Sequence, residues 1–208
     1  MRFSALTLVF LGLVVVACGT TEPAKYTEFD RPNDILAQEI QSRIDQIPYK
    51  TYQDLLLNLA WLTKRGQDAL PFLLVATEHD NPKMRSSVIW TIGRIMDIRT
   101  VPYLKRHLQD PDPEVRLEAA TALITMNDDT GLEVLVKGLG NETERYRHRC
   151  AGILRDWAKR EFGYDHRVEP EKNEKAIKQW MAWCNQVRGH QVFPVEMKGA
   201  ALPANPPE

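Results

Sequence analysis

The residues best suited to chemistry in this sequence are three evenly spaced arginines. The interval from Arg85 to Arg116 is the same as the interval from Arg116 to Arg147. A row of guanidinium groups can bind phosphates or carboxylates through paired hydrogen bonds. The same groups can instead pair with acids of the protein itself, and Asp110 lies shortly before Arg116. The spacing therefore indicates either an anion-binding ladder or a structural ladder.

Metal ligands and catalytic motifs are sparse. No histidine lies four residues from another, and no cysteine is placed to complete a zinc site, so zinc could bind only where the fold gathers distant residues. The histidines are His79, His107, His148, His166 and His190. The sequence has no Gly-x-Ser-x-Gly, no phosphate-binding glycine loop and no His-Glu-x-x-His. We therefore predict no catalytic residue, no metal site and no cofactor.

Two cysteines lie in the predicted folded body. Cys150 follows Ala119 at the same interval that separates the arginines, so it is predicted to be a small packing residue. Burial argues against a Cys–His nucleophile pair at this position. Cys184 lies on the last predicted helix, and outside the cytoplasm it could form a disulfide with Cys150. The redox state of the two thiols stays open.

The amino end has the layout of an export signal. Residues 5–17 are apolar, too few to span a bilayer comfortably, and they follow a basic start. The residues before Cys18 resemble the bacterial lipoprotein signal, although that family prefers Leu where Val15 stands. This resemblance implies cleavage before Cys18, acylation of Cys18 and export. A plain signal peptide cut after residue 17, or a buried core helix, are the alternatives.

The residue after Cys18 implies a cellular address. In lipoproteins of Gram-negative cells, Gly19 rather than Asp implies sorting to the outer membrane, facing the periplasm. Residues 18–32 are polar and predicted to form a flexible tether, and residues 191–208 are rich in Pro and Ala and predicted to be a disordered tail. The formal net charge of −1 gives no general attraction to nucleic acid, so no nucleic-acid partner is predicted.

The body between these segments has two periodicities that agree. Apolar residues recur at steps of three and four, which places them on one side of each helix. The three stripes are Met84, Val88, Ile92 and Ile95, then Val115, Ala119, Leu123 and Met126, then Tyr146, Cys150, Leu154 and Trp157. Each stripe follows the previous one at the interval that also separates the arginines. A fixed period of this kind indicates a helical solenoid.

Residues 110–123 resemble the second helix of a HEAT-like repeat, also called a PBS-lyase repeat. The resemblance implies that the arginine of each repeat pairs with an Asp near the helix turn and ties adjacent repeats together. We therefore interpret Arg85, Asp110, Arg116 and Arg147 as an inter-repeat structural ladder. His79 and Asn141 stand at the Asp position before Arg85 and Arg147 and can still accept hydrogen bonds.

The predicted fold is all-α: a short right-handed α-solenoid of HEAT-like helix pairs over residues 33–190, with about four repeats and a carboxyl-terminal capping helix. Expected helices are 33–46, 51–65, then the pairs 68–78 with 82–96, 99–109 with 113–126 and 130–139 with 142–161, and finally 171–187. The first repeat is degenerate, with Asp54 at the arginine position. Trp180 and Trp183 are expected to seal the last repeat; a ligand-binding aromatic pair is the alternative.

The second helix of each pair usually lines the ligand-facing side of a solenoid. The positions opposite the apolar stripes that we select as partner-binding candidates are Trp90, Arg94, Glu118, Thr121, Arg149 and Asp156. Trp90 is the most prominent, because its repeat equivalents are Thr121 and Gly152; it is either an exposed anchor or a residue packed in the first repeats.

These features favour a membrane-anchored lipoprotein that acts as a non-enzymatic scaffold for an unidentified, membrane-associated protein partner. One alternative is an enzyme or enzyme accessory resembling the bilin-lyase branch of these repeats. Another is an envelope element that binds anionic lipid or peptidoglycan through the basic last repeat, which carries Arg145, Arg147, Arg149, Arg155, Lys159 and Arg160.

Overall fold

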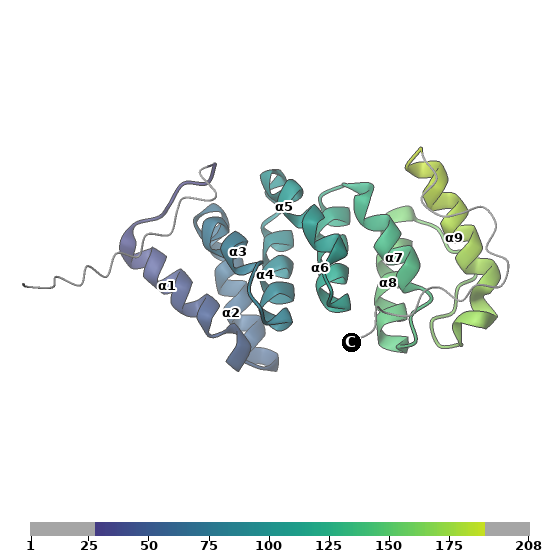
Figure 1. The fold of residues 1–208 in the computed structure, drawn as a ribbon, viewed down its shortest axis with the longest axis horizontal. Coiled ribbons are helices and arrows are strands. Elements are labelled where there is room, and N and C mark those ends of the chain that lie inside the picture. Colours follow the sequence, from purple (N-terminus) through teal and green to yellow (C-terminus); the bar gives the residue numbers. More distant parts are fainter. Residues whose placement is uncertain (1–27, 190–208) are drawn as a thin grey trace, which may run out of the picture.

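The computed structural model describes residues 28–189. Within these residues every regular element is a helix, and the helices are stacked side by side in an elongated row from α1 to α9 (Figure 1). The predicted all-α solenoid is therefore confirmed. The expected signal, Cys18 and the expected tail at 191–208 lie outside the described residues.

The helices follow the predicted order. Their bounds are α1 Asp34–Asp45, α2 Tyr52–Arg65, α3 Leu70–Ala76, α4 Pro82–Ile95, α5 Val101–Arg106, α6 Pro113–Thr125, α7 Leu132–Gly138, α8 Glu144–Ala158 and α9 Glu174–Val187. The first helix of each predicted pair (α3, α5, α7) is shorter than expected, because tight 3₁₀ turns such as Ile98–Thr100 and His107–Gln109 take up its ends. The second helix of each pair (α4, α6, α8) is the longer one.

Side-chain caps define the helix starts. The side chains of Asn33, Asn81 and Asp112 accept hydrogen bonds from backbone N–H groups in the first turns of α1, α4 and α6. Pro82 and Pro113 then occupy the first helical positions, where a missing N–H has little effect.

Residues with a positive backbone φ angle lie just after α2, α4, α6 and α8. The backbone φ angle is 55° at Gly66, 60° at Met96, 59° at Asn127 and 53° at Lys159. Gly and Asn are the residues that adopt this conformation most readily. Met96 therefore occupies a position that the backbone would fill better with Gly or Asn.

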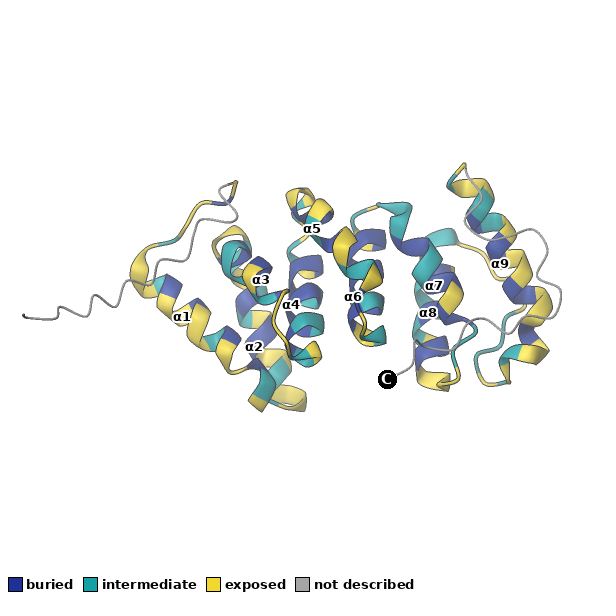
Figure 2. Cartoon of the chain, viewed as in Figure 1, coloured by how far each residue is buried: buried dark blue, intermediate teal, exposed yellow. Residues whose placement is uncertain are grey.

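The apolar stripes form the core. Every predicted stripe residue of α4, α6 and α8 is buried or half-buried, and the buried residues face the neighbouring helices (Figure 2). Small residues bring α4 and α6 together: a Cβ added at Gly93 would lie 2.7 Å from the Cβ of Ala122. Ala119 and Ala120 are fully buried, so the close helix approach predicted from them is present.

Helix α9 covers the end of the last repeat by packing on α7. Trp180 is only 2% exposed, and its ring meets Phe162 edge-on at 4.8 Å between centroids. Trp183 lies half-buried beside it, 5.4 Å away. Trp180 therefore belongs to the core, as the sealing role requires, and it is not available as a ligand-binding surface.

The first repeat departs from the predicted register. Asp54 is exposed, and the loop before α2 is held instead by Lys83, whose Nζ donates to the carbonyls of Pro48 (3.0 Å) and Lys50 (2.6 Å). Ile35, an apolar residue in the first turn of α1, is 83% exposed. A terminal unit has a neighbour on one side only, so its pattern is freer than that of the inner repeats.

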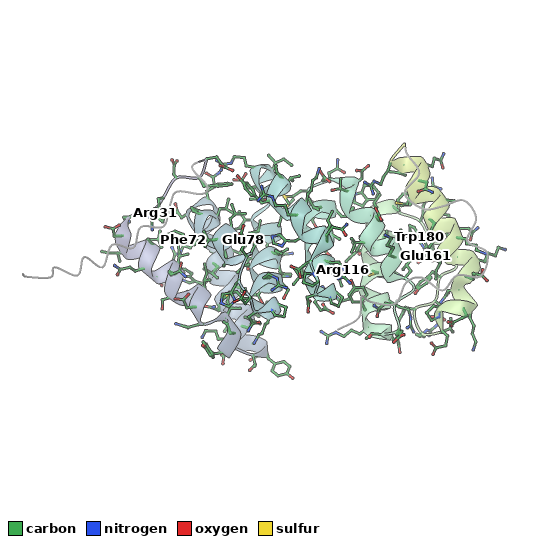
Figure 3. The ribbon with its side chains drawn as sticks, viewed as in Figure 1. Arg31, Phe72, Glu78, Arg116, Glu161 and Trp180 are labelled. Atoms are coloured by element: carbon green, nitrogen blue, oxygen red, sulfur yellow. The ribbon has the colours of Figure 1, made fainter. Side chains whose placement is uncertain are left out.

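The predicted tether ends earlier than residue 32. Phe29 is only 5% exposed and joins the core cluster of the first repeats. Arg31 lies with its guanidinium carbon 5.6 Å from the centre of the Phe72 ring on α3 (Figure 3). Residues 28–31 form a strap that is docked on the solenoid. The sequence did not reveal it, because one aromatic residue in a polar stretch has no periodicity.

Candidate partner-binding surface

The arginine ladder is fully engaged within the protein at Arg85. The Nε and Nη2 atoms of Arg85 donate to the two carboxylate oxygens of Asp110, at 2.9 and 2.8 Å. Its Nη1 atom donates to the carbonyls of His79 and Asp80 in the turn before α4, both at 2.9 Å. One guanidinium therefore joins its own repeat to the next.

Arg116 and Arg147 repeat the contacts that Arg85 makes with backbone carbonyls of the preceding turn. Arg116 Nη1 donates to the carbonyls of Asp110 and Pro111, at 2.7 and 2.9 Å. Arg147 is buried; its Nη1 donates to the carbonyls of Asn141 and Glu142, and its Nε to the carbonyl of His166.

The observed partner of Asp110 differs from the expected one. The sequence placed the Asp110 carboxylate with Arg116 of the same repeat, whereas it receives Arg85 of the preceding repeat, and Arg116 reaches Asp110 through the backbone carbonyl. The turn that carries Asp110 lies beside the start of α4, so the carboxylate closes the gap between repeats. These contacts occupy the guanidinium groups that an anion-binding ladder would need.

Charge and burial shift the pKa values of the side chains at this junction in opposite directions. Burial alone would raise the pKa of Asp110, but hydrogen bonds from Arg85 and from the Asp112 N–H lower it below its usual value. The pKa of Arg85 is raised, chiefly by its hydrogen bond to Asp110. The nearby His107 has a lowered pKa, because burial disfavours its charged form more than Asp110 favours it. The junction is therefore an ion pair beside a histidine whose charged form is disfavoured by burial.

The candidate partner-binding residues form the B-helix face, which we define by Trp90 and Arg94 on α4, Glu118 and Thr121 on α6, and Arg149 and Asp156 on α8. The three helices stand next to one another (Figure 1). Exposure increases in rows along this face. The rows containing Glu118 and Arg149 and containing Trp90 and Thr121 are half-buried, and the outer row containing Arg94 and Asp156 is exposed.

The side chains of Glu118 and Arg149 form an ion pair. Arg149 Nη2 donates to the Glu118 carboxylate, and Arg149 Nη1 donates to Glu114 at 2.6 Å. Burial raises the pKa of Glu118 even though Arg149 opposes the shift. This pair joins α6 to α8, so these two candidates lie in a repeat-to-repeat contact and are less open to a partner than the sequence suggested.

The burial of Trp90 lies between the two alternatives that the sequence left open. One part of the indole packs against the core cluster and the rest reaches the surface, with the Arg94 guanidinium carbon 5.8 Å from the ring centre. The neighbouring Thr121 is half-buried and donates its hydroxyl to the Leu117 carbonyl at 2.7 Å. The B-helix face therefore carries one half-buried indole with charged side chains at its exposed margin.

The basic last repeat is less basic at its surface than its composition indicates. Arg147 and Arg149 are engaged as described, and Arg155 lies 3.6 Å from Glu161. Arg145, Lys159 and Arg160 are exposed. This distribution weakens the proposal that α8 binds anionic lipid or glycan as one continuous basic face.

Cys150 and Cys184 are free, buried thiols, so the disulfide considered from the sequence is not present. Burial raises the pKa of Cys150 to about 12 and that of Cys184 to about 11. Cys150 packs beside Gly138, where an added Cβ would collide with its sulfur. Both thiols therefore act as packing groups and are poor nucleophiles.

Among residues 28–189, no three or more His, Cys, Asp or Glu side chains are grouped so as to hold a metal ion. Within the same residues, no helix combines the length and apolar character needed to cross a bilayer.

Comparison with known proteins agrees with this geometry. The family described as HEAT repeats matches residues 70–155, which run from the start of α3 into α8. No curated protein matches the chain. The matched segment and the stacked helix pairs together support a HEAT-like repeat protein with the fold of an α-solenoid.

Proposed function

We propose that this protein is an exported, lipid-anchored and non-enzymatic scaffold that docks a protein partner on its B-helix face. HEAT repeats generally mediate protein–protein interaction. The observation that carries the proposal is Trp90, a half-buried indole on the B-helix face with a guanidinium beside it. Trp and Arg are the residues most enriched among those that dominate binding energy at protein interfaces.

The charges at the margin of the face indicate what the partner must offer. Arg94 is exposed at one end of the outer row and Asp156 at the other. A complementary partner carries an apolar recess for Trp90, an acidic group near Arg94 and a basic group near Asp156. An extended protein surface fits this layout better than a small ligand, because the groups come from three successive repeats.

Trp90→Leu tests the docking role while it keeps an apolar group against the core. We expect the full-length chain, purified from detergent-solubilised membranes, to lose its co-purifying partner at least tenfold, since a central aromatic anchor contributes about 2 kcal/mol or more. The melting temperature should change little, because the buried part of the side chain is replaced.

Trp61→Leu is the matched control. Trp61 is a half-buried indole on α2 that lies against the guanidiniums of Arg43 and Arg65, at 4.2 and 4.1 Å. This variant should keep the partner. Equal loss of the partner from both variants would show that Trp90 has no special part in docking.

The anchor is supported by the sequence of the amino end, in which an apolar run leads directly into Cys18 and Gly19. Acylation there would attach the chain stably, because two or more acyl chains bind a bilayer far better than one. In a Gram-negative cell the proposed location is the outer membrane, facing the periplasm.

Cys18→Ala should move the protein from the membrane pellet to the soluble fraction, since it removes the only thiol at the proposed cleavage site. Fractionation followed by detection of the chain in each fraction measures this. Cys184→Ala leaves the signal intact and should stay in the pellet. Retention of Cys18→Ala in the membrane after removal of residues 1–17 would exclude the lipid anchor.

A further inference from the structure

The strap at residues 28–31 fixes where the amino-terminal segment leaves the solenoid. Phe29 is buried in the core cluster, and the Arg99 guanidinium carbon lies 4.6 Å from the centre of its ring. Arg99 Nη1 also donates to the Glu28 carbonyl at 2.9 Å, and the Tyr103 hydroxyl contacts the Glu28 carboxylate. The chain therefore departs toward residue 27 from the edge formed by the α4–α5 turn and α5.

Arg99 is itself paired with Asp97 in the same turn. Its Nη2 and Nε atoms donate to the Asp97 carboxylate at 2.6 and 3.0 Å. Asp97 also caps the turn by accepting the Arg99 N–H at 3.0 Å. The exit point is thus built on a preorganised turn and does not depend on one flexible side chain.

The same turn exposes two large apolar side chains. Met96 is 55% exposed and Ile98 is 64% exposed. One repeat later the equivalent positions are Asn127 and Asp129, in a turn with the same construction: Asn127 is left-handed, and Asp128 accepts the Thr130 N–H as Asp97 accepts that of Arg99. The fold therefore accepts polar residues in this turn, and its backbone favours Asn over Met at position 96. The apolar pair needs an explanation other than folding.

The chain that precedes the strap limits how far this turn can lie from the proposed anchor. Only the short segment 19–27 separates Cys18 from Glu28. Fully extended, it spans at most about 35 Å. A lipid at Cys18 would thus hold the exit edge close to the bilayer, and the apolar pair at that edge selects which side of the solenoid meets it.

We propose that the turn carrying Met96 and Ile98 is a membrane-contacting surface, with both side chains inserted among the lipid headgroups beside the anchor. Exposed apolar side chains gain free energy on entering the interface in proportion to the apolar area buried. Arg99 and the strap set this orientation. The inference rests on the proposed lipid anchor and adds the pose of the solenoid, which the anchor alone leaves undefined.

The test uses the full-length lipidated chain in vesicles that contain a quencher-bearing lipid. Ile98→Cys is labelled with a polarity-sensitive fluorophore, and Asp156→Cys on the B-helix face provides the matched exposed position. Cys150 and Cys184 are buried and should not compete for the label. We expect quenching by the lipid at position 98 to exceed that at position 156 at least threefold.

Two further variants test the strap and the apolar pair separately. Phe29→Ala should leave the protein on the vesicles but bring quenching at position 98 toward that at position 156, because the strap no longer fixes the exit. Met96→Asn suits the backbone, so it should melt no lower than the unsubstituted chain while it reduces quenching at position 98.

Two outcomes would overturn the pose while leaving the anchor intact. The first is equal quenching at positions 98 and 156 in protein that floats with the vesicles. The second is a blue shift at position 98 without lipid quenching, which would indicate that a protein covers the turn. Failure of the unsubstituted chain to float would remove the anchor and this pose together.

Discussion

Asp110→Ala should lower the free energy of unfolding by about 3–5 kcal/mol, since removing one partner of a buried ion pair leaves the other charge uncompensated. The Arg85 and Asp110 side chains are only 12% and 6% exposed. The substitution also removes the acceptor of the Asp112 N–H at the start of α6. Urea unfolding of the purified chain measures the loss.

Lys178→Ala is the control for this prediction. Its pair with Glu174 has the same opposite charges, but the side chains are 53% and 61% exposed. An exposed pair at this spacing is worth about 0.5 kcal/mol or less. Similar losses for Asp110→Ala and Lys178→Ala would show that the Arg85–Asp110 pair does not hold the repeats together.

The Arg85–Asp110 pair should make the free energy of unfolding depend on pH. The pKa of Asp110 is lowered in the folded chain, so its contribution is complete above the unfolded-state pKa of about 4. That contribution is lost as the pH falls through the lower folded pKa. Asp110→Ala should therefore lose less stability than the unsubstituted chain between neutral pH and strong acid.

Trp180→Ala should also cost about 3–5 kcal/mol, because it deletes a large buried side chain from the packing of α9 on α7. The effect should be local. The core divides into one cluster from the first repeats and another under α9, and repeats of a solenoid depend chiefly on their neighbours.

Hydrogen exchange separates this local effect from a global one. Amides of α7 and α9 should lose protection in Trp180→Ala, while those of α2 and α4 keep most of theirs. Val187→Ala, at a 41% exposed position of the same helix, should change stability by about 0.5 kcal/mol or less. Uniform loss of protection along the chain would contradict the division of the core.

Most of the helical framework could be predicted because two separate patterns in the sequence indicate it. The steps of three and four in stripes such as Val115, Ala119 and Leu123 give each helix its buried side, and the constant interval between stripes aligns one repeat with the next. Local signals such as Asn33 and Gly66 then place the helix ends.

The contacts between repeats could not be predicted in the same way. Arg85 and Asp110 lie in different repeats, and Arg99 reaches Glu28 from a distant part of the chain. Such pairs depend on how far one repeat is displaced against the next, which no local pattern encodes. For the same reason Glu118 and Arg149, chosen as surface residues, proved to be bonded to each other.

Site-specific photo-crosslinking in living cells tests the docking claim most directly. A photoreactive residue is placed at Arg94 and, separately, at Asp156, both exposed on the B-helix face, and at Lys178 on α9 as the control position. We predict that the same single protein is cross-linked from positions 94 and 156, that position 178 yields none of it, and that Trp90→Leu abolishes the product at position 156. Equal cross-linking from position 178, or a product unaffected by Trp90→Leu, would contradict a partner docked on the B-helix face.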